Sequence, residues 1–242
     1  MPLLVSPINS LVLFFALLVV SATGFVIGEE PQILPVSSEE AVASDYSHQR
    51  GVDFLDRTSM AWTNKYKCFT CHTNFAHLMA VSGLDQPPKY FQEVRNELDD
   101  LVQIRWPEKG PRWDAEAVMA AMTLTIVDRN LGKPLSQSAK IALDKMWQVQ
   151  QPDGGFDWLK CDWPPMESDD QYGAVVAAVA VSAAPRTYLR QKQVRDGIAR
   201  LQTYLSQSRK QELRLHHRAI LLWAQSLKSG WLTQKEIDST IA

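Results

Sequence analysis

The sequence predicts an all-α protein, and three observations support this prediction. From Tyr46 onward, apolar residues recur every three or four positions, which is the spacing of amphipathic helices. No stretch shows the alternation of apolar and polar residues that marks a half-buried strand. Proline, glycine and short polar segments separate the helical stretches, as loops between helices do. We therefore expect a body of helical hairpins.

Length and composition are those of an ordinary globular protein. The chain has 242 residues, of which 45% are hydrophobic, and its formal net charge is −2. A chain of this length can bury one sizeable core or two small ones. Lysine and arginine are scattered and form no basic stripe, so we do not expect nucleic acid as a partner.

The N-terminal segment has the composition of an export signal or a membrane anchor. Residues 11–20 read LVLFFALLVV, an apolar core of signal-peptide length, and small residues follow at 21–24. Counted over 11–27, the segment approaches the ~20 residues of a membrane span. We expect a signal peptide or an uncleaved anchor over residues 1–28, with a buried core helix as the third interpretation.

The next segment, residues 29–45, is acidic and contains Pro and Ser, as flexible linkers do. The folded body is then expected over residues 46–242. If residues 1–28 export or anchor the chain, this body lies in the periplasm or is anchored to a membrane facing the periplasm.

The first helices of the body follow from apolar spacing. A first helix is expected to bury one face, a second to end at Gly83, and a third to open at Pro87 and Pro88. The residues expected on the buried face of the first helix are Val52, Leu55, Ser59 and Trp62. Those expected on the buried face of the third are Phe91, Val94, Leu98 and Leu101.

The later helices are expected from capping residues and apolar runs. Asp114 is placed as the N-cap of a helix that is apolar nearly all round, so this helix should be well buried. Ser136 is placed as the next N-cap, and Thr233 with Glu236 has the spacing of a capping box. Three further helices are expected at residues 170–183, about 188–206 and 216–227.

Gln150, Gly154 and Phe156 have the spacing glutamine, three residues, glycine, one residue, aromatic. This resembles the QW repeat of the squalene-hopene cyclase and prenyltransferase superfamily, with Phe156 in place of the usual tryptophan. The resemblance implies helical hairpins arranged as an α/α toroid, here a partial or truncated one. Gly197, Leu201, Tyr204 and Leu205 resemble the start of a second repeat, and its Gln-Gly-Trp end is expected beyond Ala242.

The region from Gly51 to Trp231 is similar, more narrowly, to exported squalene-cyclase-like proteins of planctomycete-type bacteria. Those proteins carry the motifs FL, W, CxxCH, PDGG(W/F)DW, WPP(M)ESDD and LHHRA..LWA in this order. In this chain the motifs lie at residues 54–55, 62, 68–72, 152–158, 163–170 and 215–224.

The segment Cys68-Phe-Thr-Cys71-His72 has the Cys-x-x-Cys-His pattern to which c-type haem is attached. In that interpretation both thiols form thioether bonds and His72 is the proximal ligand of the haem iron. A disulfide between Cys68 and Cys71, a redox dithiol, and a zinc site that includes His72 and His77 remain alternatives.

A sixth ligand to the iron is not obvious from the sequence. We consider His77 and Met166 first, because Met166 follows two prolines that would hold it out rigidly. Further candidates are Met79, His216 and His217.

The acidic cluster Glu167, Asp169 and Asp170 resembles the DxDD acid motif of squalene-hopene cyclases, with Glu in the first position. The resemblance implies that Asp169 is a proton donor facing an aromatic pocket, with Glu167 and Asp170 beside it. The alternative is that Asp169 or Asp170 caps the following helix, where the helix dipole stabilises a carboxylate. Cys161 is a lone third thiol without a predicted role.

These observations predict an exported, toroid-like protein that carries covalent haem c. We expect it to act in electron transfer or redox-linked binding, with a redox partner or a lipid or isoprenoid ligand, and to associate with the membrane through residues 11–27. The alternatives are a terpenoid cyclase or isomerase that uses Asp169, and a non-catalytic binding scaffold.

Overall fold

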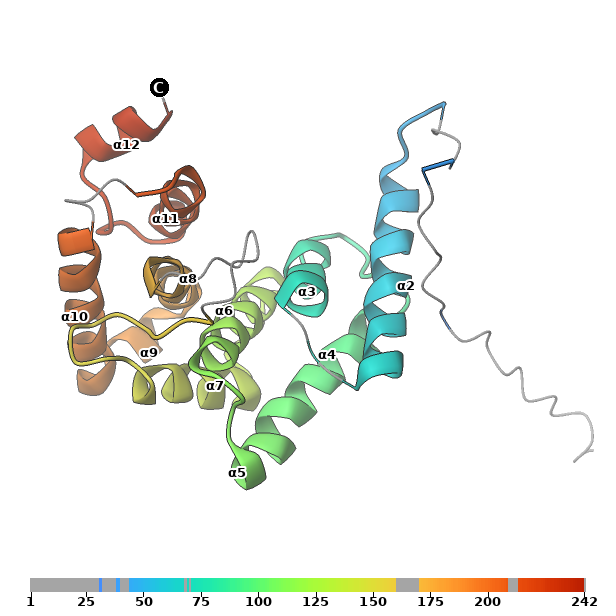
Figure 1. Cartoon of the computed structure of the whole chain (residues 1–242), viewed down its shortest axis with the longest axis horizontal. Helices are drawn as coiled ribbons and strands as arrows, with labels where there is room; N and C mark the ends of the chain where they lie inside the picture. Colours follow the sequence, from blue (N-terminus) through green and yellow to red (C-terminus); the bar gives the residue numbers. More distant parts are fainter. Residues whose placement is uncertain are drawn as a thin grey trace, which may run out of the picture. The chain divides into compact units, whose positions relative to one another are not determined.

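Every regular element of the described residues is a helix, as the sequence predicts (Figure 1). The computed structural model describes residues 31, 38–39, 44–67, 69, 71–159, 170–208 and 213–241, with only the backbone of Cys71 and His72. The first half contains α2 (His48–Tyr66), η1 (Cys71–Phe75), α3 (Ala76–Val81), α4 (Phe91–Asp100), η2 (Leu101–Arg105), α5 (Trp106–Lys109) and α6 (Asp114–Asn130). The second half contains α7 (Gln137–Gln148), α8 (Asp170–Ala183), α9 (Arg186–Leu189), α10 (Lys192–Ser208), α11 (Leu215–Leu227) and α12 (Gln234–Ile241).

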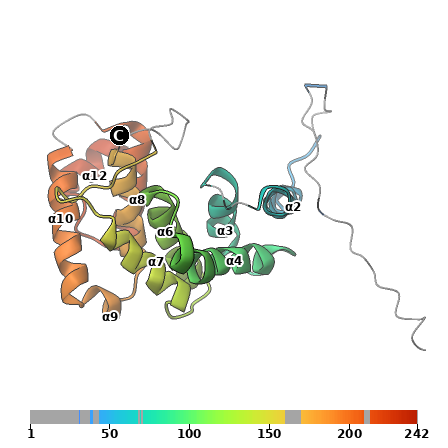
Figure 2. The same ribbon diagram turned by 60° about the horizontal axis from the view of Figure 1, so that its bottom comes forward.

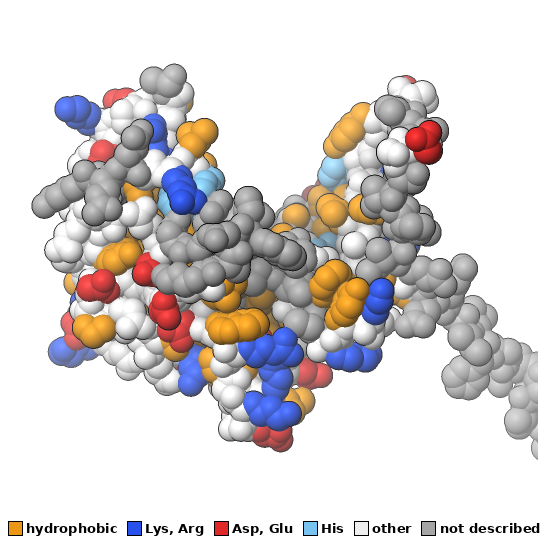
Figure 3. Space-filling model, in the orientation of Figure 1, with side chains coloured by type: hydrophobic (Ala, Val, Ile, Leu, Met, Phe, Trp, Pro, Cys, Tyr) orange, Lys and Arg blue, Asp and Glu red, His pale blue; other side chains and the backbone are white. Residues whose placement is uncertain are grey.

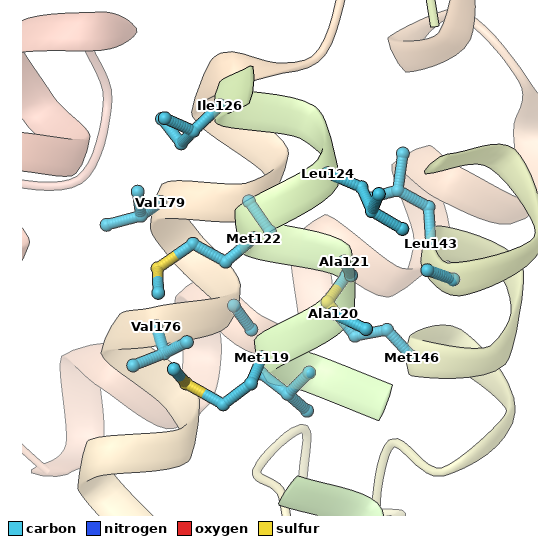
Figure 4. Close-up of a cluster of buried hydrophobic side chains, with 14 of the residues drawn as sticks. Met119, Ala120, Ala121, Met122, Leu124, Ile126, Leu143, Met146, Val176 and Val179 are labelled. Atoms are coloured by element: carbon cyan, nitrogen blue, oxygen red, sulfur yellow. The ribbon is translucent and has the colours of Figure 1, made fainter. Parts of the chain in front are cut away.

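Helices α6 and α8 form the centre of the core. Every residue of α6 from Ala115 to Asp128 is buried, and so is every residue of α8 from Tyr172 to Ala183. Figure 4 shows why: the Met119 and Met122 side chains of α6 point toward α8, while the opposite side of α6 faces Leu143 and Met146 of α7. The prediction of a well-buried helix after Asp114 is therefore confirmed.

The helices follow one another as hairpins in two rows. In one row α3 contacts α6, α6 contacts α8, and α8 contacts α11 (Figure 1, Figure 2). In the other row η2 contacts α7, and α7 meets α10 where the ring of Trp147 lies against Gly197. A Cβ added at Gly197 would lie 2.6 Å from that ring, so the two helices can approach this closely only at a glycine.

Gln150 ties the end of α7 to α10. Its Nε2 donates to the carbonyl oxygens of Gly154 (3.1 Å) and Gly197 (3.0 Å), and its Oε1 accepts from Arg200 (2.7 Å). Gly154 has φ = +96°, and a Cβ there would meet the Arg200 carbonyl oxygen at 2.2 Å. Phe156 is buried in the loop that follows. The three residues of the predicted repeat therefore form one hydrogen-bonded and packed turn.

A second glutamine clasp, which the sequence analysis did not identify, closes the end of α11. Gln225 Oε1 accepts hydrogen bonds from the backbone N–H groups of Gly230 (3.1 Å), Trp231 (2.9 Å) and Leu232 (3.1 Å). The Trp231 ring is buried, and its Nε1 donates to Ser182 of α8 (2.6 Å). This turn thus fastens the C-terminal helices to the centre of the core.

Buried charges connect α4, α6 and α7. Arg95 of α4 contacts Asp128 of α6 at 3.1 Å and donates to Ser136 at 3.0 Å. Ser136 is the N-cap of α7, as predicted, and its hydroxyl accepts from Ala139 N (3.2 Å). Asp128 also accepts from Ser136 N at 2.7 Å. Since each buried group has a partner, the network joins the middle of α4 to the end of α6 and the start of α7.

Several predicted helix details are confirmed. The predicted buried face of the third helix is correct, because Phe91, Val94, Leu98 and Leu101 are all buried. The capping box is present, since Thr233 N donates to Glu236 Oε2 (2.7 Å) and Glu236 N to Thr233 Oγ1 (3.4 Å).

Other predicted helix boundaries and caps are wrong. Asp114 is the first residue of α6 and Trp113 is its N-cap, and the third helix begins at Phe91 rather than at the prolines. The helix expected at 188–206 is divided into α9 and α10.

The predicted face of the first helix is partly wrong. Val52 and Ser59 of α2 are buried as expected, but Leu55 is about half exposed. The buried face continues instead through Asp56 and Thr63. Apolar spacing misses this arrangement because the residues that face the body on α2 are mostly polar and are buried through hydrogen bonds.

Candidate functional site

The segment of residues 68–72 joins α2 to η1. Helix α2 ends at Lys67, which has φ = 48°, the left-handed conformation of a helix C-cap, and whose N–H donates to Thr63 O at 2.9 Å. Cys71 and His72 are the first residues of the π-helical turn η1, which continues directly into α3. The Cys-x-x-Cys-His motif therefore lies between α2 and η1, with its last two residues on helical backbone.

Asn74 anchors this connection to α2 from inside the protein. Its side chain is fully buried, and Nδ2 donates to Ser59 O (3.1 Å), Ser59 Oγ (3.1 Å) and Thr63 Oγ1 (2.8 Å). Because an unpaired buried amide is costly, these bonds fix where η1 lies on α2. The position of residues 71–75 is thus set by contacts a few residues from the motif.

His77 lies one helical turn further on and faces Asp56. Its Nε2 is 3.1 Å from Asp56 Oδ1, at an ion-pair distance but without the alignment of a hydrogen bond, and both side chains are almost fully buried. Asp56 Oδ2 also accepts from Tyr90 N at 2.9 Å. The predicted alternative roles of His77, as an iron or zinc ligand, would have to coexist with this carboxylate contact.

An open pocket of about 280 Å³ lies beside the motif. Its apolar lining comes from Phe69, which lies inside the Cys-x-x-Cys segment, and from Leu101 and Ile104 of η2. The charged residues around it are Lys67, Glu97, Asp100 and Arg105. The pocket therefore offers an apolar surface with both cations and carboxylates at its rim.

A second cluster lies at the first turns of α8 and α11. The ring centroid of Tyr172 in α8 is 5.4 Å from that of Trp158, 6.1 Å from His216 and 5.9 Å from His217. The two histidine rings lie edge to face, 4.2 Å apart, and His217 is fully buried. The structure thus brings Trp158 of the PDGGFDW motif and the two histidines of the LHHRA motif to the first turn of α8.

Asp170, the first residue of α8, belongs to this cluster. Its Oδ1 accepts from the backbone N–H of Trp158 at 3.2 Å. The neighbouring ring is held closely, because a Cβ added at Gly173 would lie 2.7 Å from Trp158. The indole Nε1 of Trp158 is buried and has no hydrogen-bond partner. The carboxylate of Asp170 is thus linked to the two imidazoles only through Trp158 and Tyr172.

The structure describes only some of the predicted site residues. Cys68, Cys161, Met166, Glu167 and Asp169 lie outside the described residues. Among the other predicted residues, His77 and Asp170 have the contacts given above, and Met79 is partly buried against the core. Among the described side chains, no group of three or more His, Cys, Asp or Glu is arranged to hold a metal ion.

Sequence reasoning missed two groups of residues. The burial of Asn74 and Asp56 could not be predicted, because a single polar residue in a helical pattern is expected to be exposed to solvent. Tyr172 has no predicted role, although it contacts both histidines. His216-His217 and Asp170 both stand at the start of a predicted helix, but the sequence does not show that α8 and α11 pack together.

The chain has no match among protein-family models, curated proteins or solved structures. The described helices include none long and apolar enough to cross a membrane.

Proposed function

We propose that the chain is an exported protein of squalene-cyclase-like, toroid type that carries haem c on Cys68 and Cys71 and serves electron transfer or redox-linked binding. The observation that carries the proposal is the Cys-x-x-Cys-His motif at the α2–η1 connection, where Cys71 and His72 open a helix. The succession of helical hairpins in two rows supports the toroid type.

The residues beside the motif fit such a group. Phe69, Leu101 and Ile104 supply apolar contacts for a porphyrin, and Lys67 supplies positive charge for a propionate. Arg105 is already paired with Glu116, and the carboxylates of Glu97 and Asp100 also line the pocket. Thioether bonds to Cys68 and Cys71 would hold the group, with His72 as proximal ligand. Haem would supply one-electron chemistry, while Asn74 keeps η1 fixed on α2.

Of the two main candidates for the distal ligand, we favour Met166. His77 Nε2 is already in contact with Asp56, which would have to be broken for ligation. Methionine ligation produces a weak band near ~695 nm in the oxidised protein. We expect this band and its loss in Met166→Ala, whereas a spectrum unchanged by Met166→Ala but altered by His77→Ala would reverse the assignment.

The test of the main proposal is production in a host that has the cytochrome c maturation machinery. We expect a Soret band and haem staining that survives denaturation, both lost in Cys68→Ala/Cys71→Ala. Cys161→Ala is the matched control and keeps the haem, because Cys161 is outside the motif. Absence of covalent haem from the wild-type protein would overturn the proposal, and thiol titration and zinc analysis would then separate a disulfide, a dithiol and a zinc site.

A second candidate function is a terpenoid cyclase or isomerase in which Asp169 is the proton donor. The packing of Trp158, Tyr172, His216 and His217 beside Asp170 favours it, because aromatic faces stabilise carbocations. Cyclisation of a polyprenyl substrate that is abolished by Asp169→Asn would support this function. Product formation that survives the substitution would reject it.

A further inference from the structure

Helix α2 is amphipathic, but it turns mostly polar residues toward the body and exposes large apolar residues. The residues it turns toward the body include Asp56, Ser59 and Thr63, which are buried and bonded to Tyr90, Asn74 and each other. The residues on its outer side include Phe54, Leu55 and Tyr66, which are 46%, 49% and 47% exposed.

Leu55, Trp62 and Tyr66 lie along one side of α2, at positions i, i+7 and i+11, and Phe54 is exposed next to Leu55 in the sequence. We call these four residues the apolar stripe. Trp62 is only partly exposed, and its ring contacts that of Tyr66, with centroids 4.3 Å apart. Figure 3 shows hydrophobic side chains gathered along the surface that α2 forms. Single exposed apolar residues are ordinary, but several large ones on one helix mark an interaction surface.

The charges around the stripe are mostly positive. Arg50, Arg57 and Lys65 of α2 and the adjacent Lys67 are exposed, whereas Asp53 is the one exposed acid in this fully described helix. The Lys65 ammonium lies 5.0 Å from the centre of the Tyr66 ring, so cation and aromatic share one edge. An apolar, aromatic face with basic residues beside it is the composition of helices that lie on anionic lipid.

The N-terminal sequence would keep α2 close to such a surface. The apolar residues 11–27 are separated from α2 by residues 28–47, about 20 residues. A chain of that length spans at most about 70 Å when extended and about 25 Å on average when flexible. We propose that the outer face of α2 docks on the anionic surface of the membrane to which the chain is exported. This inference rests on the export and anchoring part of the proposed function, and not on haem.

Vesicle binding of residues 32–242, which form one compact unit without the apolar segment, tests the proposal. We expect co-sedimentation with vesicles that contain phosphatidylglycerol. The variant Phe54→Ser/Leu55→Ser/Tyr66→Ser should bind at least about tenfold more weakly, because three large apolar side chains no longer enter the interface. The matched control is Leu215→Ser/Ile241→Ser, which removes exposed apolar residues of α11 and α12 and should bind like the wild type.

A charge variant tests the contribution of the basic residues beside the stripe. Arg57→Glu/Lys65→Glu should remove the preference for anionic over neutral vesicles, because the basic rim is lost. Wild-type protein that does not bind vesicles, or equal binding by the serine variant with an unchanged circular dichroism spectrum, would overturn the proposal. A dimer that the serine variant abolishes, without vesicle binding, would identify a second copy as the occupant instead. Vesicle binding by protein that lacks haem leaves this inference standing while the haem assignment fails.

Discussion

At the scale of single residues, the contact between Asp56 and His77 is the most consequential in the first half of the chain. Both side chains are buried, and together they join α2 to α3. Removing one partner of a buried polar contact is destabilising, because the other polar group is left without compensation.

We predict that His77→Leu lowers the free energy of unfolding by about 2 kcal/mol, since Asp56 Oδ1 loses its neighbour. Adding Asp56→Asn should restore at least about 1 kcal/mol, because a neutral amide oxygen can still accept from Tyr90 N. Urea denaturation measures both, with the exposed Asp53→Ala as a control near zero. A change below about 0.5 kcal/mol in His77→Leu would show that the pair contributes little.

Two glycines in helices give opposite predictions. Gly173→Ala in α8 should cost about 1–3 kcal/mol, because its Cβ would lie 2.7 Å from the buried ring of Trp158. Gly51→Ala in α2 should instead stabilise by about 0.5–1 kcal/mol, since a Cβ there meets nothing within 4 Å and alanine is the better helix former. Thermal melts of the two variants should shift in opposite directions, and equal shifts would contradict the close packing at Gly173.

At the scale of helices and turns, the two glutamine clasps use the amide in opposite ways. Gln150 uses its Nε2 as a donor to the two carbonyl groups of Gly154 and Gly197. Gln225 uses its Oε1 as an acceptor for three backbone N–H groups. The same substitution should therefore have different effects at the two positions.

We predict that Gln150→Glu lowers the free energy of unfolding by about 2 kcal/mol, because a carboxylate oxygen would then face two carbonyl oxygens. Gln225→Glu should change it by less than about 0.5 kcal/mol, because a carboxylate accepts the same three N–H groups. Chemical denaturation at neutral pH compares the two, and a larger loss at residue 225 would refute the assigned hydrogen-bond directions.

The sequence was sufficient to predict helices, most caps and the turn at Gln150, because these depend on local spacing. It was insufficient for α2, where apolar Leu55 faces outward and polar Asp56 is buried beside His77. It was also insufficient for the second clasp, because the spacing of Gln225 to Gly230 differs by one residue from that of Gln150 to Gly154. The cluster at Tyr172 depends on the packing of α8 on α11, which one-dimensional patterns do not specify.

At the scale of the whole molecule, alkaline stability depends on the buried Tyr188. Its hydroxyl accepts from Trp147 Nε1 at 3.0 Å and lies 3.4 Å from Asp144 Oδ1. Burial, followed by the negative charge of Asp144, raises the pKa of Tyr188 well above its usual value near 10. The unfolded chain therefore loses this proton at lower pH than the folded protein does.

This contribution is fully present below pH ~10 and is lost as the pH rises further, by about 1.4 kcal/mol per pH unit until the folded form also ionises. We predict that urea denaturation between pH 9 and pH 11 shows a shallower decline for Tyr188→Phe than for the wild type. Tyr46→Phe, at an exposed position, should decline like the wild type. Identical slopes for all three proteins would disprove the role of Tyr188.

The polar inner face of α2 also determines which part of the protein unfolds locally most easily. Amide hydrogens of α6 and α8 can exchange with solvent only when the core around them comes apart, because those helices are buried on nearly all sides. Helix α2 leaves little apolar surface uncovered when it detaches, since its inner side is held mainly by hydrogen bonds to Asn74 and Tyr90. We therefore expect α2 to form a separate exchange unit whose amide hydrogens exchange before those of α6 and α8.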